Sequence, residues 1–340
     1  MAKVVVGIDF GYTYSRFAFA FKENPNEIIH GNINFHGKIP TEIILDDNNN
    51  IISFGERCKE YIINNGLIKG NYHYFKEIKR NLSEKKEKIQ AYNSLKICPL
   101  ELIIQKIFEK LKDLAIYQIK ICHPYIQNEI KYVVSIPAYW KDFQKNIIMK
   151  ACINAGLIKE EDDKSLFFCL ESEAALYYCL KYIDKNQNLM KEDSNYIICD
   201  LGCTNDIATY FVGDNENMNE LCSPTGSLFG SNEINKIFFE EIILEIFGCK
   251  DLNSYYKKYK ELNKEDEEED EEEDEEEIFS EWNELERQVN DFKEATNLEK
   301  IKNNEYHPIN LSLFKRIFID DVDLNILVGK YNQNCDNDLP

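Results

Sequence analysis

The chain has 340 residues, a net charge of −21 and 44% hydrophobic residues, so it can bury a sizeable core and form two domains or lobes. An unbroken acidic run at residues 265–277 carries 13 of the negative charges. Because such a field repels nucleic-acid phosphates and anionic membranes, the composition argues against nucleic acid and membrane surfaces as partners.

The eleven cysteines of the chain lie mostly in apolar stretches. They form no CxxC pair and no Cys/His cluster, which argues against a zinc site and favours reduced, buried thiols. The N-terminus lacks the pattern of a secretion signal, and no apolar run approaches 18 residues. We therefore expect a cytoplasmic protein, with the nucleus as an alternative compartment.

Strand and helix patterns alternate along the chain, which predicts an α/β protein with helices covering its sheets. The first half contains predicted strands at 3–10 and 15–22, a hairpin at 39–55 around DDNNN, a helix at 100–119, a strand at 131–138 and a helix at 142–156. The second half contains a strand at 165–170, a helix at 172–183, strands at 195–202 and 206–213, and a helix at 232–248.

The sequence becomes polar and then acidic from about residue 250 to 277. A segment of this composition cannot pack a core, so it is expected to be a solvated or disordered insert. Helical spacing resumes at 278–300, and one further strand is predicted at 309–314.

Two short stretches in the two halves of the chain share one pattern. DFGYTYSRFA (9–18) and DLGCTNDIAT (200–209) both read Asp, apolar, Gly, any residue, Thr. In each case an apolar strand precedes the Asp and another strand follows. One such turn is explained by a plain β-hairpin, whereas two copies indicate two related lobes that face each other across a cleft.

The residue types in these turns suit a polyphosphate. A turn built from Gly and Thr can present backbone N–H groups and a hydroxyl to an anion, because no large side chain shields them. Asp9 and Asp200, at the ends of the preceding strands, can hold Mg²⁺ through its waters and balance the phosphate charge. The paired turns therefore predict a site for a magnesium-bound nucleotide.

These motifs resemble the nucleotide-binding half of the heat-shock 70 kDa (DnaK-type) chaperones, in the actin-like ATPase superfamily. GIDFGYTYS (7–15) looks like the first phosphate loop and IICDLGCTND (197–206) like the second. Between them, YVVSIPAYWKDFQKNIIMKACINAGL (132–157) is similar to the connecting segment and LESEAALYYCL (170–180) to the glutamate helix. TGSLFGSNEIN (225–235) resembles the Gly-rich turn of lobe II. The E-x-E-A-A of the glutamate helix looks closer to the atypical, twelve-type branch.

The resemblance implies an actin-like ATPase (ribonuclease-H-like) two-lobe fold. Lobe I is expected at 1–190 with the first phosphate loop, and a partial lobe II at 191–340 with the second. ATP or ADP and Mg²⁺ are the implied cofactors, and protein clients or co-chaperones are further partners that the resemblance suggests.

Site residues follow from the same resemblance. Lys79 and Glu171 match the residues that position the attacking water, together with Asp200. Lys76 competes with Lys79 for this role, and Glu171 can also be read as an ordinary acid at a helix N-terminus. The matched nucleotide contacts are Gly11, Tyr12, Thr13, Tyr14, Gly202, Cys203, Thr204 and Gly230, and the matched metal residues are Asp9, Asp200 and Asp206.

The chain departs from the family's pattern in three ways. The second loop is one residue short, and Cys203 stands where the family has glycine, so a Cβ is expected to hinder close approach to phosphate and to limit positive φ. Tyr12 stands where a threonine is usual. No Gly-Gly turn completes an adenine pocket before Pro340, which predicts a truncated relative or an incomplete gene product.

Hydrolysis of ATP is therefore one of several expected functions. The alternatives are a catalytically inactive interaction or regulatory module, a kinase for a small metabolite on the same superfold, and an actin-like filament former. The acidic run can serve as an interaction tail for basic partners or simply as solvated filler.

Overall fold

A computed structural model describes residues 3–31, 37–65, 71–125, 130–160, 164–183, 193–213, 217–237, 244 and 248–249. The chain divides into two compact units. The first consists of Met1–Asn65 and Asn71–Gly230, and the second of Gly66–Gly70 and Ser231–Pro340. Both predicted phosphate loops lie in the first unit, and helix α6 (Ser231–Ile237) lies in the second.

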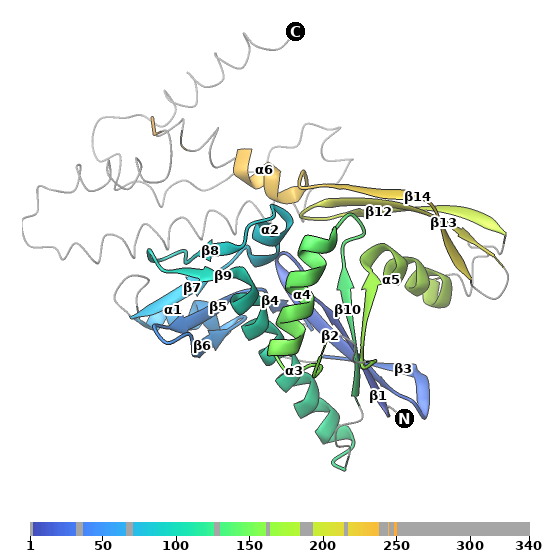
Figure 1. Ribbon diagram of the computed structural model, residues 1–340, viewed down its shortest axis with the longest axis horizontal. Helices are drawn as coiled ribbons and strands as arrows, with labels where there is room; N and C mark the ends of the chain where they lie inside the picture. Colours follow the sequence, from blue (N-terminus) through green and yellow to red (C-terminus); the bar gives the residue numbers. More distant parts are fainter. Residues whose placement is uncertain are drawn as a thin grey trace, which may run out of the picture. The chain divides into compact units, whose positions relative to one another are not determined.

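The main sheet of the first unit has the strand order β11-β10-β1-β2-β3, and β4 also pairs with β2 (Figure 1). Its strands are β1 (Val4–Asp9), β2 (Tyr14–Phe21), β3 (Asn24–His30), β4 (Ile39–Pro40), β10 (Ile130–Ile136) and β11 (Leu166–Leu170). Strands β1, β10 and β11 run parallel, whereas β2 is antiparallel to β1 and to β3. This mixed sheet, together with the helices between its strands, confirms the predicted α/β class.

Helix α3 (Leu100–Cys122) and helix α4 (Asp142–Asn154) pack against each other, and α3 also packs on β2. Apolar residues recur along α3 at helical spacing and are buried. Such an amphipathic helix packs its apolar face against the protein core. The buried residues of α3 are Leu100, Ile103, Ile104, Ile107, Phe108, Leu111, Ala115 and Ile119. Helix α4 ends next to Gly156, which has a left-handed φ of 71° and so suits a residue without a side chain.

Smaller elements extend the first half of the chain. Strands β5 (Ile43–Asp46), β6 (Ile51–Phe54) and β7 (Tyr72–Phe75) form a sheet in the order β6-β5-β7, and β8 (Lys88–Gln90) pairs with β9 (Ile97–Pro99). Helix α1 (Arg57–Asn65) follows β6, and the short α2 (Ile78–Ser83) follows β7. Ile78 and Leu82 of α2 belong to the buried core around α3, and α2 contacts both α3 and β8. Helix α1 packs on β6.

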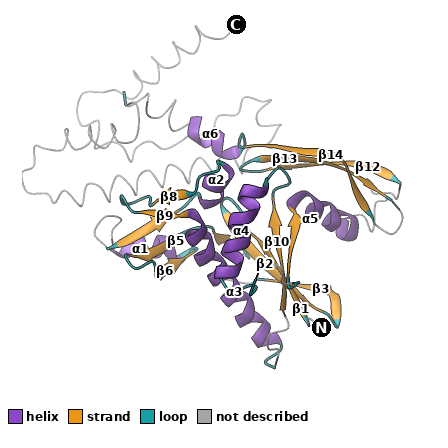
Figure 2. Ribbon diagram, viewed as in Figure 1, coloured by secondary structure: helices purple, strands orange, loops and turns teal. Residues whose placement is uncertain are grey.

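A second sheet has the order β12-β13-β14, with β12 (Ser194–Leu201), β13 (Asn205–Val212) and β14 (Met218–Ser227) all antiparallel (Figure 2). Helix α5 (Glu171–Tyr178), which continues into a π-helical turn at Cys179–Ile183, packs on β12 and β13 and on the end of β11. Leu176, Ala208, Tyr210 and Val212 form a small buried core there.

The predicted elements between 3 and 213 are all present, with ends shifted by a few residues. Seven elements were not predicted, because their apolar patterns are short or irregular. They are the strands β3, β7, β8, β9 and β14 and the helices α1 and α2. Of the predicted helix at 232–248, the structure describes α6, Leu244, Gly248 and Cys249. The acidic insert, the helix at 278–300 and the strand at 309–314 lie outside the described residues, and the division into lobes at residue 190 stays a prediction.

Candidate functional site

The two predicted phosphate loops are both β-hairpin connections. In the first, Asp9 pairs with Arg16 across β1 and β2, and in the second, Asp200 pairs with Asp206 across β12 and β13. The loop between β1 and β2 has four residues and that between β12 and β13 has three. Each loop taken alone is therefore an ordinary β-hairpin. Evidence for a shared binding site has to come from where the two hairpins lie relative to each other.

The two loops meet. The Thr13 hydroxyl and the Cys203 thiol are 3.0 Å apart, although 190 residues separate them in the chain. Thr204 hydrogen-bonds the phenol of Tyr12, which lowers the pKa of Tyr12, while burial raises that pKa and has the larger effect. A Cβ on Gly230 would collide with the carbonyl group of Cys203. The duplicated Asp-Gly-Thr turns thus come together in space, with Gly230 packed against the second one.

Lys79 and Glu171 form a short ion pair beside these loops. Lys79 Nζ donates to Glu171 Oε1 over 2.6 Å, and the lysine side chain is only 2% exposed. The ammonium also lies over two aromatic rings, 4.8 Å from the centroid of Tyr12 and 5.7 Å from that of Trp140. Each ring adds an electrostatic attraction to the ion pair, since an aromatic face carries partial negative charge.

Lys76, the competing lysine, lies elsewhere. Its Nζ sits 3.9 Å from the ring centroid of Tyr92. Between the two lysines, Glu77 has a left-handed φ of 56° at the start of α2, a conformation that is costly for a residue with a side chain. This sharp turn separates the directions of Lys76 and Lys79.

Carboxylates gather around the ion pair. Burial raises the pKa of the Glu171 carboxyl, and the charges of Asp9 and Asp200 raise it further, while Lys79 opposes them. Burial, followed by the charge of Glu171, raises the pKa of Asp206 to about 7. The predicted metal residues therefore all lie within electrostatic reach of Glu171 or of one another.

Asp206 is the most unusual of these acids. Its side chain is 5% exposed, and Oδ1 is buried without a hydrogen-bond partner. A buried carboxylate oxygen without a partner is costly unless it takes up a proton or meets a cation. Within the described ranges, no three His, Cys, Asp or Glu side chains lie close enough to coordinate one metal ion directly. Direct coordination by three protein groups is thus absent from this part of the chain.

A buried pair of hydroxyls holds the first loop in place. Thr41 donates its hydroxyl to the carbonyl of Gly11 over 3.0 Å, and its N–H donates to the carbonyl of Thr13 over 2.9 Å. The hydroxyls of Thr41 and Ser15 lie 2.8 Å apart and are buried. Thr41 was not predicted as a site residue, because nothing in its local sequence marks it as a partner of a loop thirty residues earlier.

A second set of unpredicted residues surrounds the side chain of Tyr12. The Tyr12 hydroxyl lies 2.6 Å from Ser83 Oγ and 2.8 Å from the hydroxyl of Tyr139. Trp140 Nε1 donates to the same Ser83 oxygen over 3.0 Å. Tyr139 and Trp140 belong to the IPAYW stretch that carried part of the family resemblance, which was the available signal. The tyrosine that replaces the usual threonine is therefore built into a hydroxyl network.

The other predicted nucleotide contacts are either exposed or form hydrogen bonds only within their own turn. Tyr14 is 44% exposed, and Lys38 Nζ lies 5.7 Å from its ring centroid. Gly202 N–H donates to the carbonyl of Thr204 within its own turn. Cys203 is not among the described residues with positive φ. The backbone of Cys203 thus avoids the left-handed region, as expected for a residue with a Cβ, and the hindrance of its side chain to phosphate stays a prediction.

No known protein-family profile matches the chain. The chain is 28% identical over 194 residues to human heat shock 70 kDa protein 12B, and equally so to mouse heat shock 70 kDa protein 12A. Each match covers 52% of this chain and 28% of the relative, so the chain spans well under half the length of these relatives. These two matches confirm the resemblance of the chain to the twelve-type branch of the heat-shock 70 kDa proteins.

Comparison with solved structures gives partial matches, including one to a ParM mutant and one to a MamK mutant. The pCBH ParM non-polymerisable quadruple mutant has 14% identity and a TM-score of 0.42, over 74% of this chain and 70% of that one. A MamK non-polymerising mutant bound to AMPPNP has 12% identity and a TM-score of 0.35, over 76% of this chain and 65% of that one. In the described part of the chain, no helix is both long and apolar enough to cross a bilayer.

Proposed function

We propose that this chain, which resembles the twelve-type branch of the heat-shock 70 kDa proteins, binds ATP or ADP with Mg²⁺ between its two Asp-Gly-Thr hairpins. The observation that carries the proposal is the 3.0 Å approach of Thr13 to Cys203, which brings together two copies of one loop from distant parts of the sequence. Independent hairpins have no reason to meet in this way, whereas a polyphosphate site needs N–H and hydroxyl donors from two sides.

The charges around the loops fit a hydrated cation. The unpartnered Oδ1 of Asp206 is buried, and Asp9 receives a hydrogen bond from Ser135 over 3.2 Å, which orients its carboxylate. Asp9, Asp200 and Asp206 would hold Mg²⁺ through water molecules, and the cation would compensate phosphate charge. Without a cation, the Asp206 carboxyl, with its pKa raised to about 7 by burial, is protonated in about half of the molecules at neutral pH.

Lys79 and Glu171 are the proposed positioning groups for an attacking water. A carboxyl with a raised pKa is a better proton acceptor, and Glu171 has a raised pKa with burial as its main cause. Lys79 donates a 2.6 Å hydrogen bond to the Glu171 carboxylate, which fixes its position. The lysine would also supply a positive charge near the phosphates. Catalysis of this kind depends mainly on positioning and charge stabilisation.

Titration calorimetry with ATP in the presence and absence of Mg²⁺ tests the proposal. We expect Mg²⁺-dependent binding that Asp9→Ala abolishes, whereas Asp113→Ala, an exposed acid on α3, leaves binding unchanged. A folded parent protein that binds neither ATP nor ADP would overturn the proposal. Lys79→Ala should retain binding and lose turnover, which separates the hydrolytic role from the binding role.

A second candidate function is nucleotide binding, or protein interaction, without hydrolysis. It is favoured by the contact between Cys203 and Thr13, because a side chain at this point occupies space that bare backbone would leave to phosphate. Single-turnover measurement with radiolabelled ATP distinguishes the two candidates, since only the enzyme releases phosphate. Transfer of that phosphate to a small metabolite would favour the kinase alternative instead. Clients, co-chaperones and the cytoplasmic location stay predictions.

A further inference from the structure

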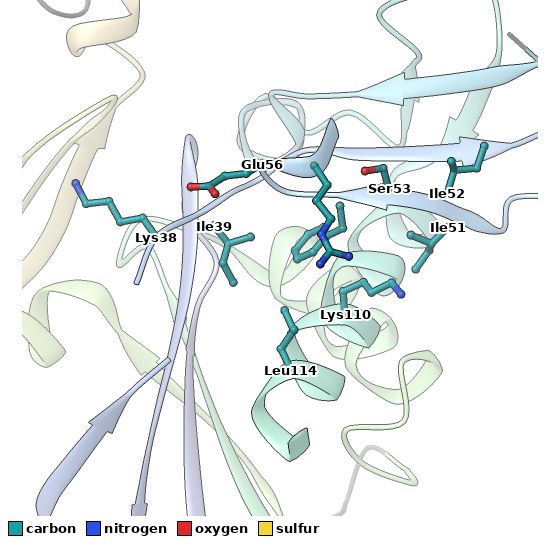
Figure 3. A pocket seen from close by; sticks show the side chains of 10 residues that line it. Lys38, Ile39, Ile51, Ile52, Ser53, Glu56, Lys110 and Leu114 are labelled. Atoms are coloured by element: carbon teal, nitrogen blue, oxygen red, sulfur yellow. The ribbon is translucent and has the colours of Figure 1, made fainter. Parts of the chain in front are cut away.

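A separate cavity of about 240 Å³ lies between β6 and the first turn of α1 on one side and α3 on the other (Figure 3). Its lining is Lys38, Ile39, Ile51, Ile52, Ser53, Phe54, Glu56, Arg57, Lys110 and Leu114. None of these ten residues belongs to the candidate nucleotide site. The cavity therefore needs an explanation of its own.

The lining combines apolar walls with an excess of positive charge. Figure 3 shows Lys110 and Leu114 on α3 facing Ile51, Ile52 and Ser53 on β6. Three cationic side chains and one carboxylate line the space. In the view of Figure 3, the Glu56 carboxylate lies on the Lys38 side, and the Lys110 ammonium lies on the opposite side.

Two of the cations, Arg57 and Lys110, have no carboxylate partner in the part of the chain that the structure describes. Glu109, next to Lys110, pairs instead with Lys106 over 3.0 Å. Arg57 is also the first residue of α1, so its charge adds to the positive end of the helix dipole rather than opposing it. Two like charges beside one cavity repel each other unless an anion lies between them.

We infer that this cavity binds a small organic anion that carries a compact apolar body and a carboxylate or phosphate group. Arg57 and Lys110 recognise the anionic group, for which the planar guanidinium is well suited. Ile39, Ile51 and Leu114 contact the apolar body. The volume is equivalent to roughly eight water molecules at about 30 Å³ each in the liquid, so the ligand is small, such as one aromatic ring with its anionic group.

The hydroxyl of Ser53 does not bind this ligand. It hydrogen-bonds the thiol of Cys58, a buried residue of α1. This internal contact ties β6 to α1 and so keeps the cavity wall in place. Recognition of the anion therefore rests on the two unpaired cations.

Saturation-transfer NMR with the full chain tests the inference, with benzoate and phenyl phosphate as probes. Benzyl alcohol tests the apolar body alone, and inorganic phosphate the charge alone. We expect transfer to at least one aromatic anion, and an affinity about tenfold lower in Arg57→Gln and in Lys110→Gln, which corresponds to one lost charge-assisted contact. Lys59→Gln, an exposed cation on the same helix that does not line the cavity, should leave the affinity unchanged.

Several outcomes would overturn the inference. They are equal binding of benzyl alcohol and benzoate, binding of inorganic phosphate alone, and affinities that Arg57→Gln and Lys110→Gln do not change. Competition between the probes and ATP would show that the anions bind at the nucleotide site, and this result would also overturn the inference. ATP affinity should be the same in Arg57→Gln as in the parent, so that failure here leaves the proposed nucleotide site untouched.

Discussion

Lys79 on α2 donates a 2.6 Å hydrogen bond to Glu171, the first residue of α5, which follows it by 92 residues. The pair links the small sheets of the first half of the chain to the helix that packs on β12 and β13. It also places one positive charge within reach of Asp206 and of Glu171, two acids with raised pKa values. Positioning and stability therefore depend on the same contact.

Removal of Lys79 should destabilise the fold strongly. Lys79→Ala leaves Glu171 largely buried and uncompensated, which costs about 3 kcal/mol in free energy of unfolding. Urea denaturation measures this value. Lys76→Ala is the matched control and should cost less than about 1 kcal/mol, because a cation–π contact such as that with the ring of Tyr92 is weaker than a buried ion pair.

A double-mutant cycle gives the coupling between the two partners. The Lys79→Ala/Glu171→Ala variant should be clearly more stable than the sum of the single effects predicts, because no charge is left unpaired. Equal losses in Lys79→Ala and Lys76→Ala, or strict additivity of the two single changes, would contradict the assigned ion pair.

Asp206 should make stability depend on pH. Its pKa is about 7 in the folded chain and about 3.9 when unfolded, so the folded state binds more protons between these values. The contribution of Asp206 is fully favourable below about pH 4 and is lost as the pH rises to 7. Asp206→Asn should therefore gain on the order of 2 kcal/mol over the parent at pH 8 and almost nothing at pH 4.

Urea denaturation at several pH values checks this dependence, with Asp113→Asn as the control that should show no such trend. Mg²⁺ with nucleotide should reduce the advantage of Asp206→Asn, since a nearby cation stabilises the carboxylate of the parent. A stability difference that stays the same from pH 4 to pH 8 would rule out the raised pKa.

Thr41 should support the first loop through its hydroxyl. Thr41→Val keeps the shape but leaves the Gly11 carbonyl and the buried Ser15 hydroxyl without this partner, at a cost of about 1–2 kcal/mol in stability. We also expect weaker binding of Mg²⁺-ATP by calorimetry, because the loop loses its fixed position. Thr209→Val, which removes an exposed hydroxyl on β13, should alter neither quantity, and an identical effect of both variants would count against the role of Thr41.

Cys203 should limit nucleotide affinity by its bulk. Cys203→Gly removes the Cβ and thiol that contact Thr13, so ATP should bind several-fold more tightly. Cys203→Ala keeps the Cβ and removes only the sulfur. A gain in Cys203→Gly alone identifies the Cβ as the obstacle, a gain in both identifies the thiol, and unchanged affinity in both would show that the short loop itself sets the limit.

Local patterns were enough for much of this chain. The apolar runs around β1, β2, β10 and β12 and the periodicity of α3 predicted their elements, because strand and helix periods are properties of neighbouring residues. The repeat of Asp-Gly-Thr also predicted two equivalent turns. Strands β3 and β14 were not predicted, since apolar and polar residues alternate too weakly in them to distinguish a strand from a loop.

The sequence by itself determined the α/β class, the two matching hairpin turns and the family resemblance, because these depend on residue types at short, fixed spacings. Tertiary structure decided that the turns meet, that Lys79 rather than Lys76 pairs with Glu171, and that Thr41, Ser83 and Tyr139 support the loops. It also decided which acid lacks a partner, since burial and charge at Asp206 come from residues distant in the chain. Such contacts are set by packing, and no short window of sequence contains them.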